Sequence, residues 1–319
     1  MAFLIGVDEA GYGPNLGPLV VAATVWQIPD QPSVNLYSRL ADGVCHEPGE
    51  ADQRRVAIAD SKLLYKPRGS LANLERAIYP ILGCLQQSVQ TWQKAWSTLA
   101  PDSRSQRTRL PWYAEYDEIV PIDLDVDAIR ILVEPMNELQ TRCGIKLTAI
   151  RSTAIFPECF NQLITTLGNK SNLLSDVTLK LVRDLLAECP GQRAKVNCDK
   201  HGGRNQYAGM LHGIFPETLA RVHEEGRAVS QYDMQIDSRQ VSFRFSAKGE
   251  RFLESALASM VAKYLRELAM RAFNAYWCSR VERLRPTAGY PVDAKRFFAE
   301  ISAAADASGI ARDHIWRCR

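Results

Sequence analysis

Short apolar runs of strand length alternate along this chain with amphipathic segments of helical length. The first two runs are Phe3–Val7 and Leu19–Trp26, and a glycine-rich connection separates them. Apolar runs of this length, bounded by glycine, proline or polar residues, are typical of β-strands. The other strands that we predict are Cys84–Trp92, Lys146–Ser152, Ala194–Cys198 and Val241–Phe245. Strands that alternate with helices favour an α/β fold.

Apolar residues at helical spacing mark the helices. The longest such pattern includes Leu253, Leu257, Met260, Val261 and Tyr264, within a predicted helix that spans Phe252 to Val281. The other helices that we predict are Pro67–Leu82, Val126–Cys143, Asn172–Glu188, Val292–Ala305 and Ala311–Trp316. The C-terminal part, about residues 250–319, is therefore expected to be helical.

The chain contains no segment with the composition of a linker, so we predict a single domain over residues 1–319. Two stretches interrupt the alternation and are expected to be insertions. One covers about residues 27–58, contains Pro29, Pro32 and Pro48, and is predicted to be irregular. The other covers about residues 95–125; its polar, basic segment 101–121 is predicted to be a long surface excursion.

Charge is unevenly distributed. The net charge of +3 and the sequence pI of about 8.4 are only mildly basic. From Arg244 to the end, however, the chain contains fourteen Lys or Arg and only eight Asp or Glu. A basic C-terminal third suits a polyanionic partner such as a nucleic acid. The alternative is that helix faces with unequal charge are simply solvated.

The cysteines and the apolar runs exclude several classes of protein. None of the eight cysteines is spaced as C-x-x-C, which argues against a structural zinc site. The longest apolar runs are too short for a membrane span, and Asp8 interrupts the first run before it could serve as a secretion signal. We therefore expect a cytoplasmic protein with reduced thiols and no membrane association.

Two consecutive carboxylates, Asp8 and Glu9, end the first apolar strand. Burying one such charge is costly unless something compensates it, and two together increase the cost. A divalent cation such as magnesium is the usual compensation, because it prefers hard oxygen ligands. The alternative is that both residues lie at an exposed strand end before a turn.

The segment that begins at Gly6 reads Gly-Val-Asp-Glu-Ala-Gly-Tyr-Gly-Pro-Asn-Leu-Gly-Pro-Leu-Val-Val-Ala-Ala and ends at Ala23. It resembles the opening motif of type 2 ribonuclease H, in which a strand ending in Asp-Glu-Ala-Gly precedes a Gly-Pro and a second strand rich in Val and Ala. This resemblance implies an α/β, ribonuclease H-like fold, with a mixed central sheet flanked by helices.

Further segments resemble the family in the same order along the chain. Ala258–Glu267 is similar to the family helix Ala-Ser-Ile-Val-Ala-Lys-Val-Thr-Arg-Asp. The shorter matches are Asp60–Leu63, Asn172–Leu174, Asp199 after a strand, Lys248–Glu250, Gly289–Pro291, and His314 with Arg317 and Arg319. The resemblance therefore extends in outline over most of the chain.

The resemblance implies a catalytic metal site formed by Asp8, Glu9, Asp199 and Glu267, holding Mg²⁺ or Mn²⁺ and expected to bind two ions. Where this chain has Glu267, the family usually has aspartate. On the alternative interpretation Glu267 is a solvated helix residue, and Asp199 is a turn or cap residue before a glycine pair.

Substrate contacts are implied for two groups of residues. The loop Gly11-Tyr12-Gly13 would approach the sugar, because glycine has no Cβ to obstruct the strand. Type 2 enzymes carry arginine where this chain has Tyr12, which can stack but cannot pair with a phosphate. The other implied contacts are Ser61, Lys62, Lys248, Lys263 and Tyr276, with Tyr290 as the alternative tyrosine. His201 is a candidate proton shuttle or a solvated loop residue.

The function implied is metal-dependent endonucleolytic hydrolysis of the RNA strand of RNA–DNA hybrids, leaving a 5′-phosphate and a 3′-hydroxyl. Cleavage at single ribonucleotides within duplex DNA is open, because Tyr12 replaces the arginine. Three alternatives remain: a type 3-like ribonuclease H that prefers longer hybrids, a catalytically weakened protein that binds hybrids or a protein partner, and a generic metal-dependent nuclease that acts on other structures. The expected partner is nucleic acid, and the chain is expected to be a monomer.

Overall fold

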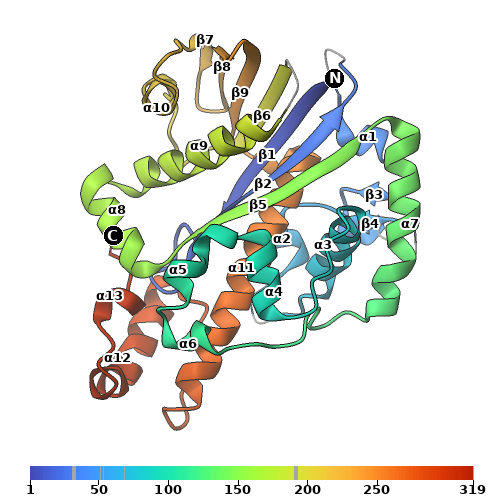
Figure 1. The fold of residues 1–319 in the computed structure, drawn as a ribbon. Coiled ribbons are helices and arrows are strands. Elements are labelled where there is room, and N and C mark those ends of the chain that lie inside the picture. Colours follow the sequence, from blue (N-terminus) through green and yellow to red (C-terminus); the bar gives the residue numbers. More distant parts are fainter. Residues whose placement is uncertain (31–33, 51, 53, 68, 190–192, 319) are drawn as a thin grey trace.

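A seven-stranded sheet forms the centre of the molecule (Figure 1). The computed structural model describes residues 1–319 except 31–33, 51, 53, 68, 190–192 and 319. The strand order is β5-β2-β1-β6-β9-β8-β7. The strands are β1 Ala2–Ala10, β2 Leu19–Ile28, β5 Lys146–Ile155, β6 Arg193–Asp199, β7 Arg221–Glu225, β8 Val229–Ile236 and β9 Arg239–Ser246.

Both parallel and antiparallel pairs occur in this sheet. β1 pairs in parallel with β6, and β6 in parallel with β9, whereas the pairs β1–β2, β2–β5, β8–β9 and β7–β8 are antiparallel. The mixed central sheet predicted from the sequence is confirmed. Because parallel neighbours end at the same edge of a sheet, the ends of β1 and β6 lie next to each other.

Helices cover both faces of the sheet, which explains why β1 is apolar on both sides. Leu4 faces the larger core, which includes helix α11 (Leu253–Cys278). Ile5 faces the other core, which includes helix α9 (Lys170–Glu188). Successive strand residues point to opposite faces, so the two consecutive carboxylates at the end of β1 must also point apart.

Helix α11 packs directly on β1 and β2. Gly6 makes this contact possible, because a Cβ at that position would overlap the backbone of Glu254 in the first turn of the helix. Leu257, Val261 and Leu265 are fully buried on α11. The long C-terminal helix predicted from the sequence is therefore a core element of the fold.

The remaining helices agree with the predicted helical segments and add several short ones. The predicted set is confirmed as α3 Ala72–Cys84, α7 Val126–Cys143, α9, α11, α12 Pro291–Ala307 and α13 Arg312–Ile315. The elements without a sequence prediction include α8 Pro157–Leu167, α10 Ala208–Ile214, and strands β7 and β8. Within the described residues, none of the helices has both the length and the apolar character needed to cross a membrane.

Two predictions about the connections are wrong. The segment Cys84–Trp92 is not a strand. It is the connection between α3, which ends at Cys84, and α4 (Trp92–Leu99); Gln86 takes a positive φ of 56° there, and Thr91 forms an isolated bridge with Ile119. The segment 101–121 is not a surface excursion. It contains η2 Pro101–Ser103, α5 Arg104–Arg107 and α6 Pro111–Ala114, and α6 buries Trp112 and Tyr113.

The first insertion is partly regular. It contains α1 Leu36–Arg39, η1 Pro48–Glu50, and strands β3 Val44–Cys45 and β4 Val56–Ala57, which pair in parallel. Residues 31–33, 51 and 53 of this insertion lie outside the described residues, as does Arg319. α2 (Ser61–Leu64) follows, and η3 (Gly249–Arg251) precedes α11. The single domain over 1–319 stays a prediction.

Candidate active site

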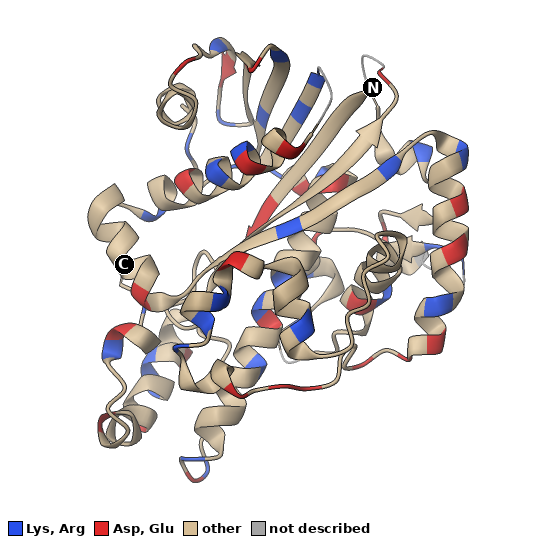
Figure 2. Cartoon of the chain, in the orientation of Figure 1, with Lys and Arg blue, Asp and Glu red and all other residues tan. Residues whose placement is uncertain are grey.

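The parallel pairing of β1 with β6 brings three of the predicted carboxylates to one edge of the sheet. Val7 pairs with Cys198, so Asp8 lies beside Asp199 at the ends of the two strands. Figure 2 shows this end of β1 in red, whereas the rest of the strand is tan. Glu9 follows Asp8 on the opposite face of the strand. Asp8, Glu9 and Asp199 therefore share one corner of the molecule, as predicted from the sequence.

Asp8 points toward α11, and its environment disfavours the charged form. Burial, and then the negative charges of Glu9 and Asp199, raise the pKa of Asp8 well above its usual value. Hydrogen bonds to Asp8 from Ser259 and from the Glu9 backbone N–H (2.8 Å) act in the opposite direction without cancelling the shift.

Glu9 shows the same effect. Burial, followed by the charge of Asp199, raises the pKa of Glu9 to about 7. The Lys62 ammonium group partly offsets this rise. Both acids are therefore buried next to a third carboxylate, so that burial and then mutual repulsion disfavour their charged forms.

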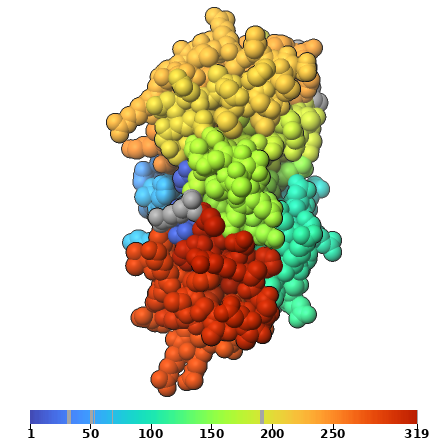
Figure 3. Space-filling view, turned by 90° about the vertical axis from the view of Figure 1, so that its left-hand side faces the viewer, coloured from blue at the N-terminus to red at the C-terminus, as the bar shows by residue number. Residues whose placement is uncertain are grey.

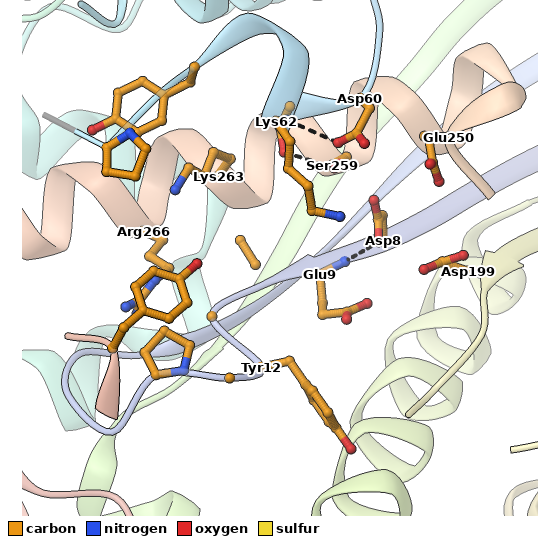
Figure 4. A pocket seen from close by; sticks show the side chains of 18 of the residues that line it. Asp8, Glu9, Tyr12, Asp60, Lys62, Asp199, Glu250, Ser259, Lys263 and Arg266 are labelled. Carbon is orange, nitrogen blue, oxygen red and sulfur yellow. Dashed lines mark hydrogen bonds between the residues drawn. The ribbon is translucent and has the colours of Figure 1, made fainter. Parts of the chain in front are cut away.

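A fourth carboxylate comes from the turn before α11. The backbone N–H of Gly249 donates to the Asp199 carboxylate (2.9 Å), which fixes η3 against the end of β6. A Cβ on Gly249 would lie 2.9 Å from Asp199 Cα, so only glycine permits this approach. Glu250 follows directly and lines the same pocket as Asp8 and Asp199 (Figure 4).

Helix α2 presents Ser61 and Lys62 to the carboxylates. Asp60 caps the helix by accepting from the Lys62 backbone N–H (3.0 Å), and the Ser61 hydroxyl lies 3.2 Å from that of Ser259. Burial acts to lower the pKa of Lys62, but the carboxylates around it, led by Asp60 and Asp8, raise it overall. Lys62 is therefore a cation that the acidic cluster holds in place.

Farther along α11, the pocket wall becomes basic. The Lys263 ammonium group lies 2.6 Å from Glu267 and 4.7 Å from the centre of the Tyr65 ring. The Tyr65 hydroxyl donates to the other oxygen of Glu267 (2.8 Å). One turn along, Arg266 is buried and donates to three backbone carbonyl groups, those of Pro18 (2.7 Å), Leu16 (3.1 Å) and Ala288 (3.2 Å).

The loop after β1 closes the basic side of the pocket. Gly11 has a φ of +90°, which favours glycine, and a Cβ there would lie 3.0 Å from the Arg266 guanidinium. Tyr12 does not stand free in this loop, because its hydroxyl would overlap any Cβ on Gly202. Its ring thus packs toward the turn after β6 and away from the carboxylates (Figure 4).

These residues enclose a single pocket of about 400 Å³. Its acidic end and its basic end lie on either side of Lys62 (Figure 4). The acidic end has Asp8, Glu9, Asp60, Asp199 and Glu250, and the basic end has Lys66, Lys263 and Arg266, with Tyr290 beside the glycine loop. In the part of the chain that the structure describes, no three His, Cys, Asp or Glu are gathered closely enough to hold a metal ion as they stand.

Glu267 is not brought to this acidic group. It follows Ser259 by eight residues on α11, a rise of roughly 12 Å along the helix axis. Its carboxylate is engaged by Tyr65 and Lys263 and lines a separate cavity of about 180 Å³. The sequence-based assignment of Glu267 to the metal site is therefore corrected, and Glu250 lies where the fourth carboxylate was expected.

Three other predicted residues also lie elsewhere. Tyr276 packs at 5.9 Å from the Trp112 ring and beneath Arg280, so it is Tyr290 that lines the pocket. Lys248 precedes η3 with a φ of +65° but does not line the pocket. His201 is buried, lies 2.9 Å from the Ser175 hydroxyl, and has its pKa lowered to about 3 by burial and then by Arg204. This environment excludes a proton shuttle near neutral pH.

Sequence reasoning missed Glu250, Ser259 and Arg266 as pocket residues. All three lie within the segments quoted for the resemblance, so the signal was present. The sequence did not show where these side chains point, because spacing alone does not tell which side of a helix or turn faces the strand ends.

No protein-family model and no curated protein matches this chain. Among solved structures it is similar to a chain of the PCNA:RNase HII complex from Archaeoglobus fulgidus, with 15% identity, 99% of this chain and 94% of that chain covered, and a TM-score of 0.44. The ribonuclease H2 of Pyrococcus horikoshii OT3 is similar at 14% identity, 98% and 92% coverage, and a TM-score of 0.44. Bst-RNase HIII in complex with Mn²⁺ is similar at 13% identity, 99% and 66% coverage, and a TM-score of 0.40. The likeness is one of fold.

Proposed function

We propose that this protein is a metal-dependent endonuclease that hydrolyses the RNA strand of RNA–DNA hybrids. The observation that carries the proposal is the division of one pocket into an acidic end and a basic end. Clustered carboxylates alone would repel a polyanion. Cations within the same pocket let a phosphodiester approach, while the carboxylates remain beside its scissile bond.

The acidic end suits a divalent cation by its donor chemistry. Asp8, Glu9, Asp199 and Glu250 offer hard oxygen ligands, which Mg²⁺ and Mn²⁺ prefer. Burial, and then repulsion from the neighbouring carboxylates, raises the pKa values of Asp8 and Glu9, and Lys62 only partly offsets the rise at Glu9. We propose these four carboxylates as the holders of the ions, two of which we expect by the resemblance to type 2 ribonuclease H.

Bound divalent cations would supply an activated water and neutralisation of the leaving oxygen. The side chains have their own tasks. Ser259 and the Gly249 N–H orient Asp8 and Asp199. Lys62 and Lys263 neutralise the phosphates on either side of the scissile bond, while the buried Arg266 holds the loop through its bonds to backbone carbonyl groups. The resemblance implies products with a 5′-phosphate and a 3′-hydroxyl.

Selection of RNA is proposed for the loop that contains Gly11 and Gly13, which lies at the pocket without a side chain at either glycine. A 2′-hydroxyl distinguishes RNA from DNA, and backbone groups can read it at close range. Tyr12, between these two glycines, is uncharged, and its ring packs toward Gly202. The loop therefore offers no charged side chain for the phosphate at an RNA–DNA junction. This favours continuous hybrids over single embedded ribonucleotides as the better substrate.

The test uses three labelled duplexes with Mg²⁺ or Mn²⁺: a continuous RNA–DNA hybrid, DNA with one ribonucleotide, and DNA alone. We expect cleavage of the continuous hybrid, weaker cleavage at the single ribonucleotide, and none of DNA. Asp8→Asn should abolish cleavage. Asp42→Asn is the matched control, because Asp42 is an exposed residue whose side chain pairs with Arg142.

The outcomes separate the alternatives. Equal cleavage at the single ribonucleotide would show that the loop needs no arginine for junctions. Tight binding of the hybrid without cleavage in either metal would support a binding protein on a nuclease fold and overturn the proposed activity. Cleavage that persists in Asp8→Asn would refute the site.

A further inference from the structure

Two buried arginines lie beneath the loop formed by residues 11–18. Arg266 is 3% exposed and Arg317 is fully buried. Among the described residues neither guanidinium meets a carboxylate at hydrogen-bond distance; both donate to backbone carbonyl groups. A buried charge without a counterion is costly, and burial lowers the pKa of both. Hydrogen bonds to the backbone carbonyl groups of the loop partly compensate each buried charge.

The two arginines hold different parts of the loop. Arg266 donates hydrogen bonds to the carbonyl groups of Leu16 and Pro18, near the start of β2. Arg317 donates to the carbonyl groups of Gly11 (2.6 Å) and Tyr12 (3.3 Å), which lie at the pocket, and more distantly to that of Gly17 (3.5 Å). The Arg317 guanidinium stacks 4.0 Å from the centre of the Phe160 ring on α8, which limits its freedom to turn away.

This arrangement fixes the direction of two peptide planes. Both peptides are trans, so the N–H of each points opposite to its carbonyl group. With the Gly11 and Tyr12 carbonyl groups held by Arg317, the N–H groups of Tyr12 and Gly13 point away from it. Neither N–H donates to any group among the described residues.

The C-terminal segment is itself seated on the loop. The Arg317 backbone N–H donates to the Asn15 carbonyl group (2.8 Å), and the Asn15 side chain donates to the Arg317 carbonyl group (3.0 Å). Leu16 and Trp316 form a β-bridge. Asn161 on α8 binds the segment from the other side, at Trp316 and Cys318. Figure 3 shows the red C-terminal part lying against the green of α8.

We infer that Arg317 is a positioning residue for substrate recognition. It holds the Gly11–Tyr12–Gly13 peptides so that the N–H groups of Tyr12 and Gly13 form a pair of donors for a sugar hydroxyl or phosphate oxygen of the bound strand. The identity of the ligand rests on the proposed function. The hydrogen bonds between Arg317 and the loop, which we call the latch, do not depend on that function. A residue more than 300 positions away in sequence thereby sets the geometry of the loop.

The experiment compares Arg317→Ala and Arg317→Lys with the wild type and with Arg312→Ala, a change to a cation in the same C-terminal segment that contacts Phe298 and Trp316 but not the loop. Hydrogen exchange of residues 11–18 reports on the latch. The affinity for an RNA–DNA hybrid, measured in EDTA, reports on the donor pair without requiring cleavage. Added guanidinium at low millimolar concentration, with NaCl as the ionic control, tests for rescue of Arg317→Ala.

We expect faster exchange confined to residues 11–18 and a loss of hybrid affinity on the order of 10-fold in both Arg317 variants, since lysine cannot hold two carbonyl groups in a fixed fork. Guanidinium should restore part of the affinity of Arg317→Ala, and Arg312→Ala should match the wild type.

Unchanged exchange and affinity in folded variants would overturn the inference. Faster exchange throughout the molecule, without rescue, would reduce Arg317 to a purely structural role. A wild type that cleaves no duplex would defeat the proposed function, while local exchange would still decide the latch.

Discussion

Two glutamates near the pocket differ in position: Glu250 lines the pocket, whereas Glu267 lines a separate cavity and contacts two residues of the basic end, Lys263 and Tyr65. Glu250 adjoins Asp8 and Asp199 at the acidic end. Glu267 accepts from both Lys263 and Tyr65 and so serves the basic end. The same functional group therefore has two different roles: Glu250 adds charge for a cation to neutralise, and Glu267 keeps a cation in position.

Glu250→Gln and Glu267→Gln should consequently differ in their effects. Losing a carboxylate from the acidic end should reduce cleavage by on the order of 100-fold and weaken the apparent affinity for Mg²⁺. Glu267→Gln keeps a hydrogen-bond acceptor for Tyr65 and should leave the Mg²⁺ affinity unchanged, with a moderate increase in KM. Cleavage rates over a Mg²⁺ titration measure both effects.

The control for this pair is Glu138→Gln on α7, a change of the same kind at an exposed residue. A Mg²⁺ affinity that falls with Glu267→Gln and not with Glu250→Gln would reverse the two assignments and restore the expectation drawn from the sequence.

The sequence was sufficient for those site residues whose position follows from the strands. Asp8, Glu9 and Asp199 end parallel neighbours, and the register brings them together. Glu250 was within a matched segment but was not assigned, and Tyr290 was only the alternative to Tyr276, because a turn and a loop direct their side chains. The direction of such side chains depends on contacts that are distant in sequence, such as that between Gly249 and Asp199.

At the scale of secondary-structure elements, the second insertion is part of the core. On α6, Trp112 packs at 5.3 Å from Phe273 of α11, and Tyr113 stacks on Trp92 at 5.7 Å. Arg107 lies over the Trp92 ring. The polar residues around these aromatic side chains led to the prediction of a surface excursion. Only the tertiary structure shows that the insertion covers α11.

Trp112→Ala should therefore destabilise the protein by about 3–5 kcal/mol, the usual cost of truncating a large buried aromatic side chain. Ile119→Ala, in the same insertion, should change the free energy of unfolding by less than about 0.5 kcal/mol, because Ile119 is 79% exposed. Denaturant unfolding of both variants measures the difference. Similar small losses in the two would mean that α6 does not belong to the cooperative core.

The elements that the sequence did not predict have a physical explanation. Every residue of β7 is exposed, so the strand has no alternating apolar pattern to recognise. It is an edge strand, whose sequence Arg-Val-His-Glu-Glu carries the charges that discourage pairing with another chain. Its place in the sheet follows from pairing with β8 rather than from its own composition.

At the scale of the whole molecule, the buried acids make stability depend on pH. Burial raises the pKa of Glu254 to about 7, and burial with the Asp199 charge does the same for Glu9. In the unfolded chain both titrate near 4.5. Below that pH both states are protonated and the full stability is present. As pH rises toward 7 the unfolded state ionises first, so each group costs roughly 3 kcal/mol of stability once pH exceeds its folded pKa.

The two acids should respond differently to a cation, which separates structure from function. Glu254 is buried in the first turn of α11, where it accepts a hydrogen bond from the Asn197 side chain away from the pocket. Glu254→Gln should therefore match the wild type near pH 4.5 and exceed its stability at pH 8. Its response to Mg²⁺ should be unchanged.

Glu9 lines the pocket, where Mg²⁺ is proposed to bind. Mg²⁺ at pH 8 should therefore raise the melting temperature of the wild type and of Glu254→Gln, and should raise that of Glu9→Gln much less. Thermal unfolding at both pH values, with Mg²⁺ or EDTA, gives the comparison. An equal Mg²⁺ response in all three proteins would mean that the cation binds elsewhere, because the charge it compensates would not be that of Glu9.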